Sequence, residues 1–252
     1  DEVITFLFVA KDVPSVGYRT YYLEKGKPSA FKTTSKSEGP LFENNFFKAE
    51  FADGGLKSIF DKELSVELLN TGKFLGGELF TMQSVGNGAG EFTDVQQPTM
   101  EGFEKMSQYK QQWTLVSSGP VRVVYEFKKE ITHVTVLERV VFYQELKRID
   151  FEVELLGFDG ERYREFRLAF PLNQTTSDVA YEVPMGVIRV GRDEMAGAAG
   201  FSKPSQIYNT PCAQVHPREV QDWFSAFDGK NSVIISSDVA VFDWIDPTEN
   251  PV

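Results

Sequence analysis

The amino-acid sequence predicts an all-β fold in which two large antiparallel sheets face each other. Nearly every patterned segment alternates apolar and polar residues with a period of two, which is typical of half-buried strands. Turn signals rich in glycine and proline separate these segments, and no amphipathic helix exceeds two turns. Aromatic residues make up 13% of the 252 residues, with 22 phenylalanines, and such residues favour strands and sheet cores.

The first sixty residues show two hairpin patterns with a polar stretch between them. Residues 1–24 predict two short strands around a turn at 14–17. The polar stretch that follows has no periodicity and indicates a linker, so we expect a domain boundary near Pro40. Residues 47–60 then predict a hairpin, because two alternating runs flank the turn sequence Asp53-Gly54-Gly55.

The remaining strands are expected at intervals along the rest of the chain, at 111–116, 121–130, 132–143, 146–155, 166–170, 179–190 and 233–242. In the strand 146–155, the apolar residues Ile149, Phe151, Val153 and Leu155 lie on one face and the acidic residues Asp150, Glu152 and Glu154 on the other. Apolar faces should meet between the sheets. The acidic face, which lies beside Lys147 and Arg148, should be solvated rather than catalytic.

Composition excludes several classes of partner. The net charge is −11, with 26 Lys and Arg against 37 Asp and Glu and no compact basic run, which argues against nucleic acid and anionic membranes. No apolar stretch approaches the roughly 20 residues that span a bilayer. The single cysteine, Cys212, allows no internal disulfide, and no motif marks it as a nucleophile.

Three irregular polar stretches are candidates for a site, because function concentrates in loops. The first, 76–98, carries Glu78, Glu91 and Asp94 among several glycines. These carboxylates are suited to binding or cleaving a sugar. An equally good interpretation is a long connection between the sheets.

The second stretch, 216–223, combines His216, Arg218, Glu219 and Trp223. Arg218 is suited to holding a hydroxyl or carboxylate, and Trp223 to stacking on a sugar ring. Alternatively, Trp223 belongs to the core and the charges to a surface loop.

The third stretch, 186–201, carries Arg189 and Arg192 from a strand into a glycine- and alanine-rich loop. These arginines either bind a substrate at the edge of a sheet or pair with Asp193 and Glu194.

Seven segments follow one another along the chain in a characteristic order: VGYRTYYL, FFKAEFADGGLKSIFDKELSVELL, SSGPVRVVYEF, LERVVFYQELKRIDFEVEL, YREFRLAFPLN, YEVPMGVIRVG and VQDW. This ordered series resembles the C-terminal region of the α-mannosidases of glycoside hydrolase family 38. The most specific part is the run RVVFYQELKRIDF followed by AFPL, and the resemblance extends from about Val13 to beyond Trp223.

This resemblance implies a fold and an activity. Residues 1–40 would be the end of a small β linker domain, and 41–252 a large supersandwich resembling galactose mutarotase. The family's catalytic barrel, with its Asp nucleophile and a zinc ion held by His and Asp side chains, would lie upstream of Asp1. The enzyme would be a retaining α-mannosidase acting on mannosides. This chain would hold neither a catalytic residue nor a metal ligand and would be inactive alone.

The resemblance also implies residues that complete the sugar pocket. Glu78 stands where some members place an aromatic residue in a Gly-x-Tyr-Leu-Phe segment, and Arg189 matches an arginine that reaches the site. With Arg218, these are the substrate-binding residues we expect. Two alternatives remain: a free-standing carbohydrate-binding module, which needs exposed aromatics such as Trp113, Trp223 and Trp244, or a mutarotase-like epimerase using His216 and Glu219 as acid and base. The sequence leaves the compartment, the linkage preference and self-association open.

Overall fold

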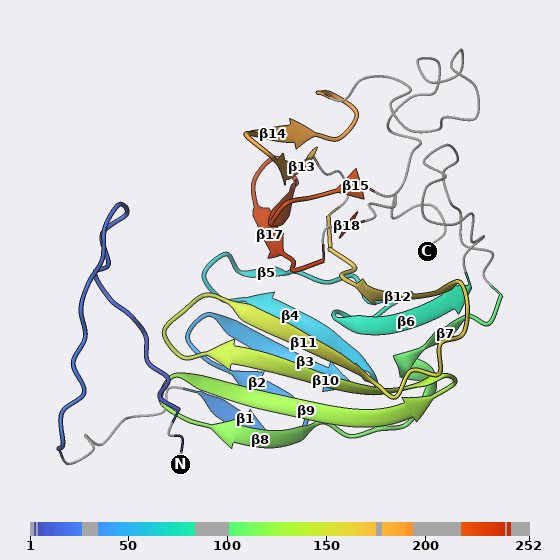
Figure 1. The fold of residues 1–252 in the computed structure, drawn as a ribbon, viewed down its shortest axis with the longest axis horizontal. Coiled ribbons are helices and arrows are strands. Elements are labelled where there is room, and N and C mark those ends of the chain that lie inside the picture. The colour runs from blue at the N-terminus through green and yellow to red at the C-terminus, as the bar shows by residue number, and fades with distance from the viewer. Residues whose placement is uncertain are drawn as a thin grey trace. The chain divides into compact units, whose positions relative to one another are not determined.

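The computed structural model describes residue 3 and residues 5–26, 35–83, 101–174, 178–193, 218–239 and 241–242. In these parts the chain is all-β, apart from a single 3-10 turn, η1 (Met106–Gln108), and every strand pairing is antiparallel (Figure 1). None of the described helical segments is long and apolar enough to cross a membrane. The predicted fold class is confirmed.

The strands follow one another along the chain with short turns between most of them. They are β1 (Lys36–Glu38), β2 (Leu41–Glu43), β3 (Phe47–Ala52), β4 (Gly55–Asp61), β5 (Val66–Glu67), β6 (Glu78–Gln83), β7 (Glu104–Lys105), β8 (Thr114–Ser118), β9 (Arg122–Ile131), β10 (Val134–Tyr143), β11 (Ile149–Leu156), β12 (Arg164–Ala169), β13 (Asp178–Val183), β14 (Gly186–Arg189), β15 (Arg218–Glu219), β16 (Trp223–Phe227), β17 (Ser232–Ser236) and β18 (Val241–Phe242).

The strands group into two compact units that are interleaved in sequence. Unit 1 comprises Asp1–Glu67 and Ser107–Gly160, and unit 2 comprises Leu68–Met106 and Glu161–Val252. The sequence predicts a boundary near Pro40 instead. In the structure Pro40 lies in the turn between the paired strands β1 and β2. The division of the chain at residue 40 stays a prediction.

Unit 1 is a sandwich of two sheets, with strand orders β1-β2-β3-β4-β5 and β11-β10-β9-β8. Its core lies where the apolar faces meet. The ring of Phe42 stacks on that of Phe142 with centroids 4.0 Å apart, and Phe51 approaches Tyr125 at 4.5 Å. All four side chains are buried. The alternation of apolar residues in β3 and β10 therefore places one face of each sheet inside, as the sequence predicts.

The predicted hairpin at residues 47–60 is confirmed as β3 and β4, joined at Asp53-Gly54. Gly54 has φ of +87°, a left-handed conformation that glycine adopts without steric cost. The long strands β9 and β10 pair over their whole lengths, from Arg122 opposite Tyr143 to Ile131 opposite Val134.

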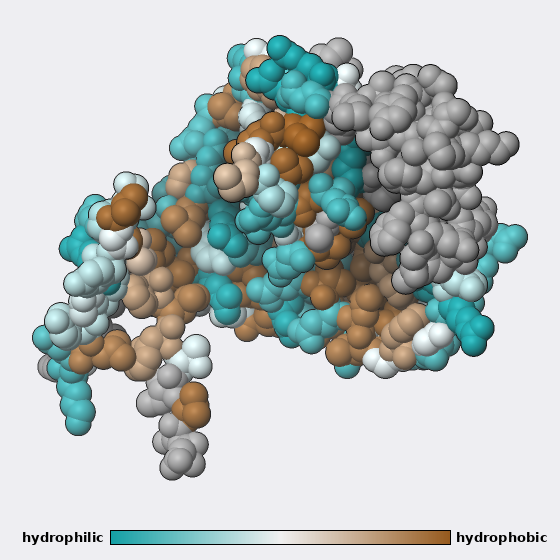
Figure 2. Space-filling model, turned by 45° about the horizontal axis from the view of Figure 1, so that its top comes forward, coloured by the Kyte–Doolittle hydropathy of each residue, from teal (hydrophilic) through white to brown (hydrophobic). Residues whose placement is uncertain are grey.

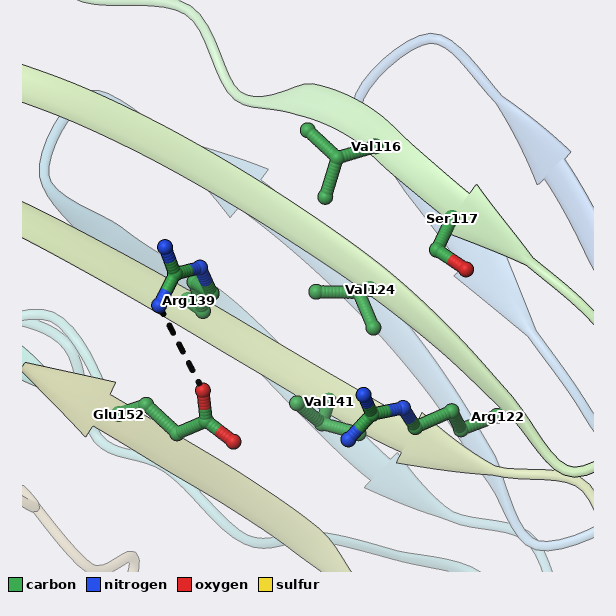
Figure 3. A pocket seen from close by; sticks show the side chains of 7 residues that line it. All are labelled: Val116, Ser117, Arg122, Val124, Arg139, Val141 and Glu152. Atoms are coloured by element: carbon green, nitrogen blue, oxygen red, sulfur yellow. Dashed lines mark ion pairs between the residues drawn. The ribbon is translucent and has the colours of Figure 1, made fainter. Parts of the chain in front are cut away.

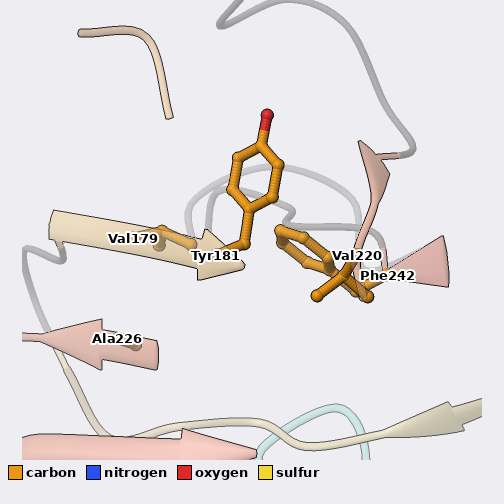
Figure 4. Close-up of a cluster of buried hydrophobic side chains, with 5 residues drawn as sticks. All are labelled: Val179, Tyr181, Val220, Ala226 and Phe242. Carbon is orange, nitrogen blue, oxygen red and sulfur yellow. The ribbon is translucent and has the colours of Figure 1, made fainter. Parts of the chain in front are cut away.

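Unit 2 contains three smaller sheets, with orders β12-β6-β7, β14-β13-β16-β17 and β15-β18. One apolar cluster joins β13, β16 and β18 with the residue that follows β15, and its buried members are Val179, Tyr181, Val220, Ala226 and Phe242 (Figure 4). A second cluster consists of Phe74, Phe80 and Met82.

Several predicted strands were wrong in extent. Residues 5–26 contain no strand, and large apolar side chains there are exposed, including Tyr18 and Tyr22; Figure 2 shows apolar and polar residues mixed along this segment. The polar stretch before Pro40 ends in strand β1. The strand expected at 179–190 is two strands, β13 and β14, because the chain reverses at Met185 with φ of +67°. The strand expected at 233–242 is divided into β17 and β18.

Candidate functional site

Glu78 begins strand β6 and is completely buried. One carboxylate oxygen, Oε2, accepts the backbone N–H of Leu75 at 2.8 Å. Gly77, with φ of +71°, donates its N–H to the carbonyl of Ala169 at 2.7 Å, which ties this turn to strand β12. The carboxylate thus closes its own turn. Its expected contact with sugar hydroxyls stays a prediction.

Arg218 begins strand β15 and is also buried, with 8% of its surface exposed. It pairs with Phe242 of β18, and the ring of Phe242 stacks on Phe224 at 4.4 Å. The backbone of Arg218 is therefore attached to the apolar cluster of Figure 4 through its strand partner. His216 lies outside the described residues, as do Cys212, Glu91, Asp94, Glu194 and Trp244, so the proposed pair of His216 with Glu219 stays a prediction.

Arg189 ends strand β14 and is exposed. Asp193 accepts its backbone N–H at 3.1 Å through Oδ2, and the N–H of Asp193 donates to the carbonyl of Arg189 at 3.1 Å. The guanidinium makes no ion pair with a described residue. Asp193 therefore holds the turn after β14 through the backbone of Arg189.

The fold brings Arg189 and Trp223 onto one sheet, whereas Arg218 and Glu78 lie on two others. Arg189 is opposite Ala180, which is opposite Ser225 on the next strand. Trp223 is two residues from Ser225 and therefore lies on the same face of the sheet. Phe224 and Ala226, on the opposite face, join the apolar cluster. Trp223 is thus half-buried on the face away from that cluster.

Trp113 is part of the core of unit 1. Its ring lies 4.9 Å from Phe51 and 4.6 Å from Phe127. Its indole Nε1 donates to the carbonyl of Ala52 at 3.0 Å. This tryptophan is therefore held by the sandwich rather than presented to a sugar.

The acidic face of β11 is neutralised by arginines, as expected for a solvated face. Arg139, on the neighbouring strand β10, donates to Glu126 at 2.7 Å and to Glu154 at 2.6 Å, and lies 3.9 Å from Glu152 (Figure 3). The hydrogen bonds to Glu154 and Glu126 raise the pKa of the Arg139 guanidinium. These contacts form an ion-pair network on a solvated face rather than a catalytic pair.

The outward face of the β8–β11 sheet also contains a hollow that sequence analysis missed. Its volume is about 260 Å³, and it is lined by Val116, Ser117, Arg122, Val124, Arg139, Val141 and Glu152 (Figure 3). These residues come from four strands, and only the register of strand pairing brings them together: Val124 lies opposite Val141, and Arg139 opposite Glu152. Alternation alone predicts the face of each strand but not the register.

The parts of the chain that the structure describes hold no group of three or more His, Cys, Asp or Glu side chains suited to a metal ion. His133, at the turn between β9 and β10, contacts Asp159 through Nδ1 at 2.8 Å. This contact ties the β9–β10 turn to the segment after β11 and fits a structural histidine. The described residues do not fit a zinc site.

Comparison with known proteins relates this architecture to a family. The model of the glycosyl hydrolases family 38 C-terminal domain matches residues 42–204. Among solved structures, the fold is similar to an alpha-mannosidase from Enterococcus faecalis V583, with a TM-score of 0.66 and 14% sequence identity. The similarity covers 89% of this chain and 26% of that one, so this chain spans about a quarter of the enterococcal protein. No curated protein matches the sequence.

The family model covers well over half of the chain and includes the core strands of the unit 1 sandwich and the β6–β12 pair of unit 2. The segments that suggested the resemblance lie mostly within this range. The chain belongs to the glycosyl hydrolases family 38 C-terminal domain family.

Proposed function

We propose that this chain is the C-terminal β-sandwich region of a zinc-dependent retaining α-mannosidase that acts on mannose-containing glycans. The observation that carries the proposal is the match of the family 38 C-terminal domain model to residues 42–204. The likeness of the fold to an alpha-mannosidase over 89% of the chain supports it. In this proposal the region packs on a catalytic barrel supplied by another part of the same protein.

The region's own contribution would be to complete the mannoside pocket. Arg189 is the best placed of the expected residues, because its guanidinium is exposed and makes no ion pair with a described residue. A planar guanidinium can donate to two adjacent sugar hydroxyls at once. Glu78 and Arg218 are buried, so they would act on the pocket mainly by holding the backbone that borders it.

The zinc ion would be bound by histidine and aspartate side chains of the barrel. The described residues of this chain do not form such a site, and we assign no step of the reaction to them.

The proposal is tested on the full product of the gene that encodes this chain. We expect that protein to contain one tightly bound zinc per polypeptide, measured by elemental analysis. We also expect proton NMR to detect α-mannose as the first product from an aryl α-mannoside. A retaining enzyme inverts the anomeric carbon twice, first when its nucleophile displaces the aglycone and again when water displaces the nucleophile. A zinc-free active protein, or β-mannose as the first product, would contradict the assigned mechanism.

A further inference from the structure

The hollow on the outward face of the β8–β11 sheet in unit 1 has the chemical groups of a small sugar site. We propose that it binds one hexose unit, either free or at the end of a glycan. The argument uses only the groups that line the hollow, so it does not depend on the proposed function. A volume of about 260 Å³ lies just below the range of typical ligand pockets and suits a single sugar ring.

The floor of the hollow is aliphatic. Val116, Val124 and Val141 belong to the neighbouring strands β8, β9 and β10, and Val124 lies opposite Val141. Val124 and Val141 are buried, whereas Val116 keeps 48% of its surface exposed on the edge strand. The C–H face of a pyranose ring is apolar and can pack on this floor, where Val116 is the valine that still exposes hydrocarbon to water.

A free hydrogen-bond donor stands above this floor. Arg122 extends from β9 so that its guanidinium lies beside Val141 of β10 (Figure 3). Within the described chain this guanidinium makes no hydrogen bond or ion pair, unlike the guanidinium of Arg139, which two carboxylates hold. Its five N–H groups form a fork that can engage two neighbouring hydroxyls.

An acceptor and a hydroxyl complete the site. The side chain of Glu152 is 47% exposed, and its ion pair with Arg139 is 3.9 Å long, which is beyond hydrogen-bonding distance. Its carboxylate can therefore accept hydrogen bonds from a ligand. Ser117, which lines the hollow from β8, can donate or accept one. Adjacent hydroxyl groups both donate and accept, so they match this combination better than a purely accepting ligand does.

The charge around the hollow argues against an anionic ligand. Three guanidinium groups and four carboxylates lie in or next to the hollow: Arg122, Arg139 and Arg148, and Glu126, Asp150, Glu152 and Glu154. A phosphate or carboxylate would meet no net positive charge and would approach the exposed Glu152. A neutral polyol avoids this repulsion.

The test is isothermal titration of the 252-residue chain with methyl α-mannopyranoside, with sodium acetate as the anionic probe. For one ring, we expect a Kd on the order of 1–10 mM. Arg122→Met and Glu152→Gln should each raise the Kd at least about tenfold, because each removes a charged hydrogen-bonding group. Lys128→Met and Glu130→Gln change the same charges on the same face of β9, at exposed positions outside the lining, and should leave the Kd unchanged.

Circular dichroism of each variant shows whether it is folded. Arg122→Met and Glu152→Gln test sugar binding in the hollow independently, so one of them still decides the question if the other fails to fold. A tighter Kd for a mannose-terminated glycopeptide than for the methyl glycoside would identify a glycan end as the ligand, whereas equal values would identify a free hexose. The proposal is overturned if the chain does not bind the mannoside at about 50 mM, or if acetate binds instead. It is also overturned if binding survives Arg122→Met and is lost in Arg189→Met, which would place the sugar in unit 2.

Discussion

The side chain of Asn44 links the two sheets of unit 1 through the carbonyl of Tyr143. Its Nδ2 donates to that carbonyl at 2.9 Å, and its Oδ1 accepts the N–H of Phe46 at 2.9 Å and of Phe47 at 2.7 Å. Asn44 follows β2 and Tyr143 ends β10, so residues 99 positions apart in sequence are joined in the buried part of the sandwich. Asn44 itself is 2% exposed; its bond with Phe47 is buried and the other two bonds are partly buried.

The first prediction concerns this link. Asn44→Ala should lower the free energy of unfolding by about 2–4 kcal/mol, because it leaves one carbonyl and two amides, all at least partly buried, without their partner. Urea denaturation measures the change. Asn45→Ala, at the exposed neighbouring asparagine, should cost less than about 0.5 kcal/mol. Equal costs for the two variants would show that the link contributes nothing specific.

The second prediction concerns Gly102 in unit 2. Its φ is +59°, and a Cβ there would lie 2.9 Å from Nη2 of Arg164, whose Nη1 donates to the Gly102 carbonyl at 2.8 Å. Gly157 has φ of +65° with nothing near its Cβ position, so Gly157→Ala measures the backbone strain alone. We expect Gly157→Ala to cost about 1 kcal/mol and Gly102→Ala about 1–3 kcal/mol more. Thermal unfolding checks this, and similar costs would mean that Arg164 moves aside freely.

The third prediction is a pH dependence. Burial raises the pKa of the Tyr125 phenol, so the folded state favours the neutral form. Stability from this residue is therefore complete below pH 10, the approximate pKa of an unfolded tyrosine, and is lost as the pH rises above it. Tyr125→Phe should flatten the fall in melting temperature above about pH 10. Tyr163→Phe, at an exposed tyrosine, controls for the loss of a hydroxyl. If the melting temperature falls equally in wild type and Tyr125→Phe, the alkaline loss of stability does not come from Tyr125.

The fourth prediction tests the expected pocket residues in the full enzyme. Arg189→Met should lower kcat/KM for an aryl α-mannoside about 10- to 100-fold, because it removes a charged donor from the sugar. Glu78→Gln and Arg218→Met should also lower kcat/KM, because each buried side chain holds backbone that borders the pocket. For the same reason both variants should lower the melting temperature. Arg162→Met, at an exposed arginine of the same unit, is the control. Unchanged kinetics in Arg189→Met would remove Arg189 from the pocket.

Sequence patterns predicted the sandwich because period-two alternation reports which side of a strand is buried. The hairpin of β3 and β4 was found from its turn residues, and β9 and β10 from their alternation. The same signal misplaced strands in residues 5–26, where aromatic residues alternate but no partner strand covers them in the structure. For β11 the predicted apolar face is only half-buried, because β11 lies at the edge of its sheet.

The candidate site was harder to predict than the fold. In the sequence, nothing distinguishes Glu78 and Arg218 from exposed polar residues. Only the tertiary structure shows that both are buried. No sequence pattern marks Arg122 as a binding residue, because an arginine at the beginning of a strand is common. Its significance arises from Val141 and Glu152, which register places beside it from two other strands.

The most direct test of the central claim compares hydrolysis of p-nitrophenyl α-mannoside by this 252-residue chain and by the full product of its gene. We predict that the full product releases p-nitrophenol, that a zinc chelator abolishes this release, and that the folded chain alone releases none above the buffer control. Turnover by the purified chain alone, lost in a variant of one of its own residues, would contradict the account. So would a full product that is folded and zinc-loaded but inactive on α-mannosides.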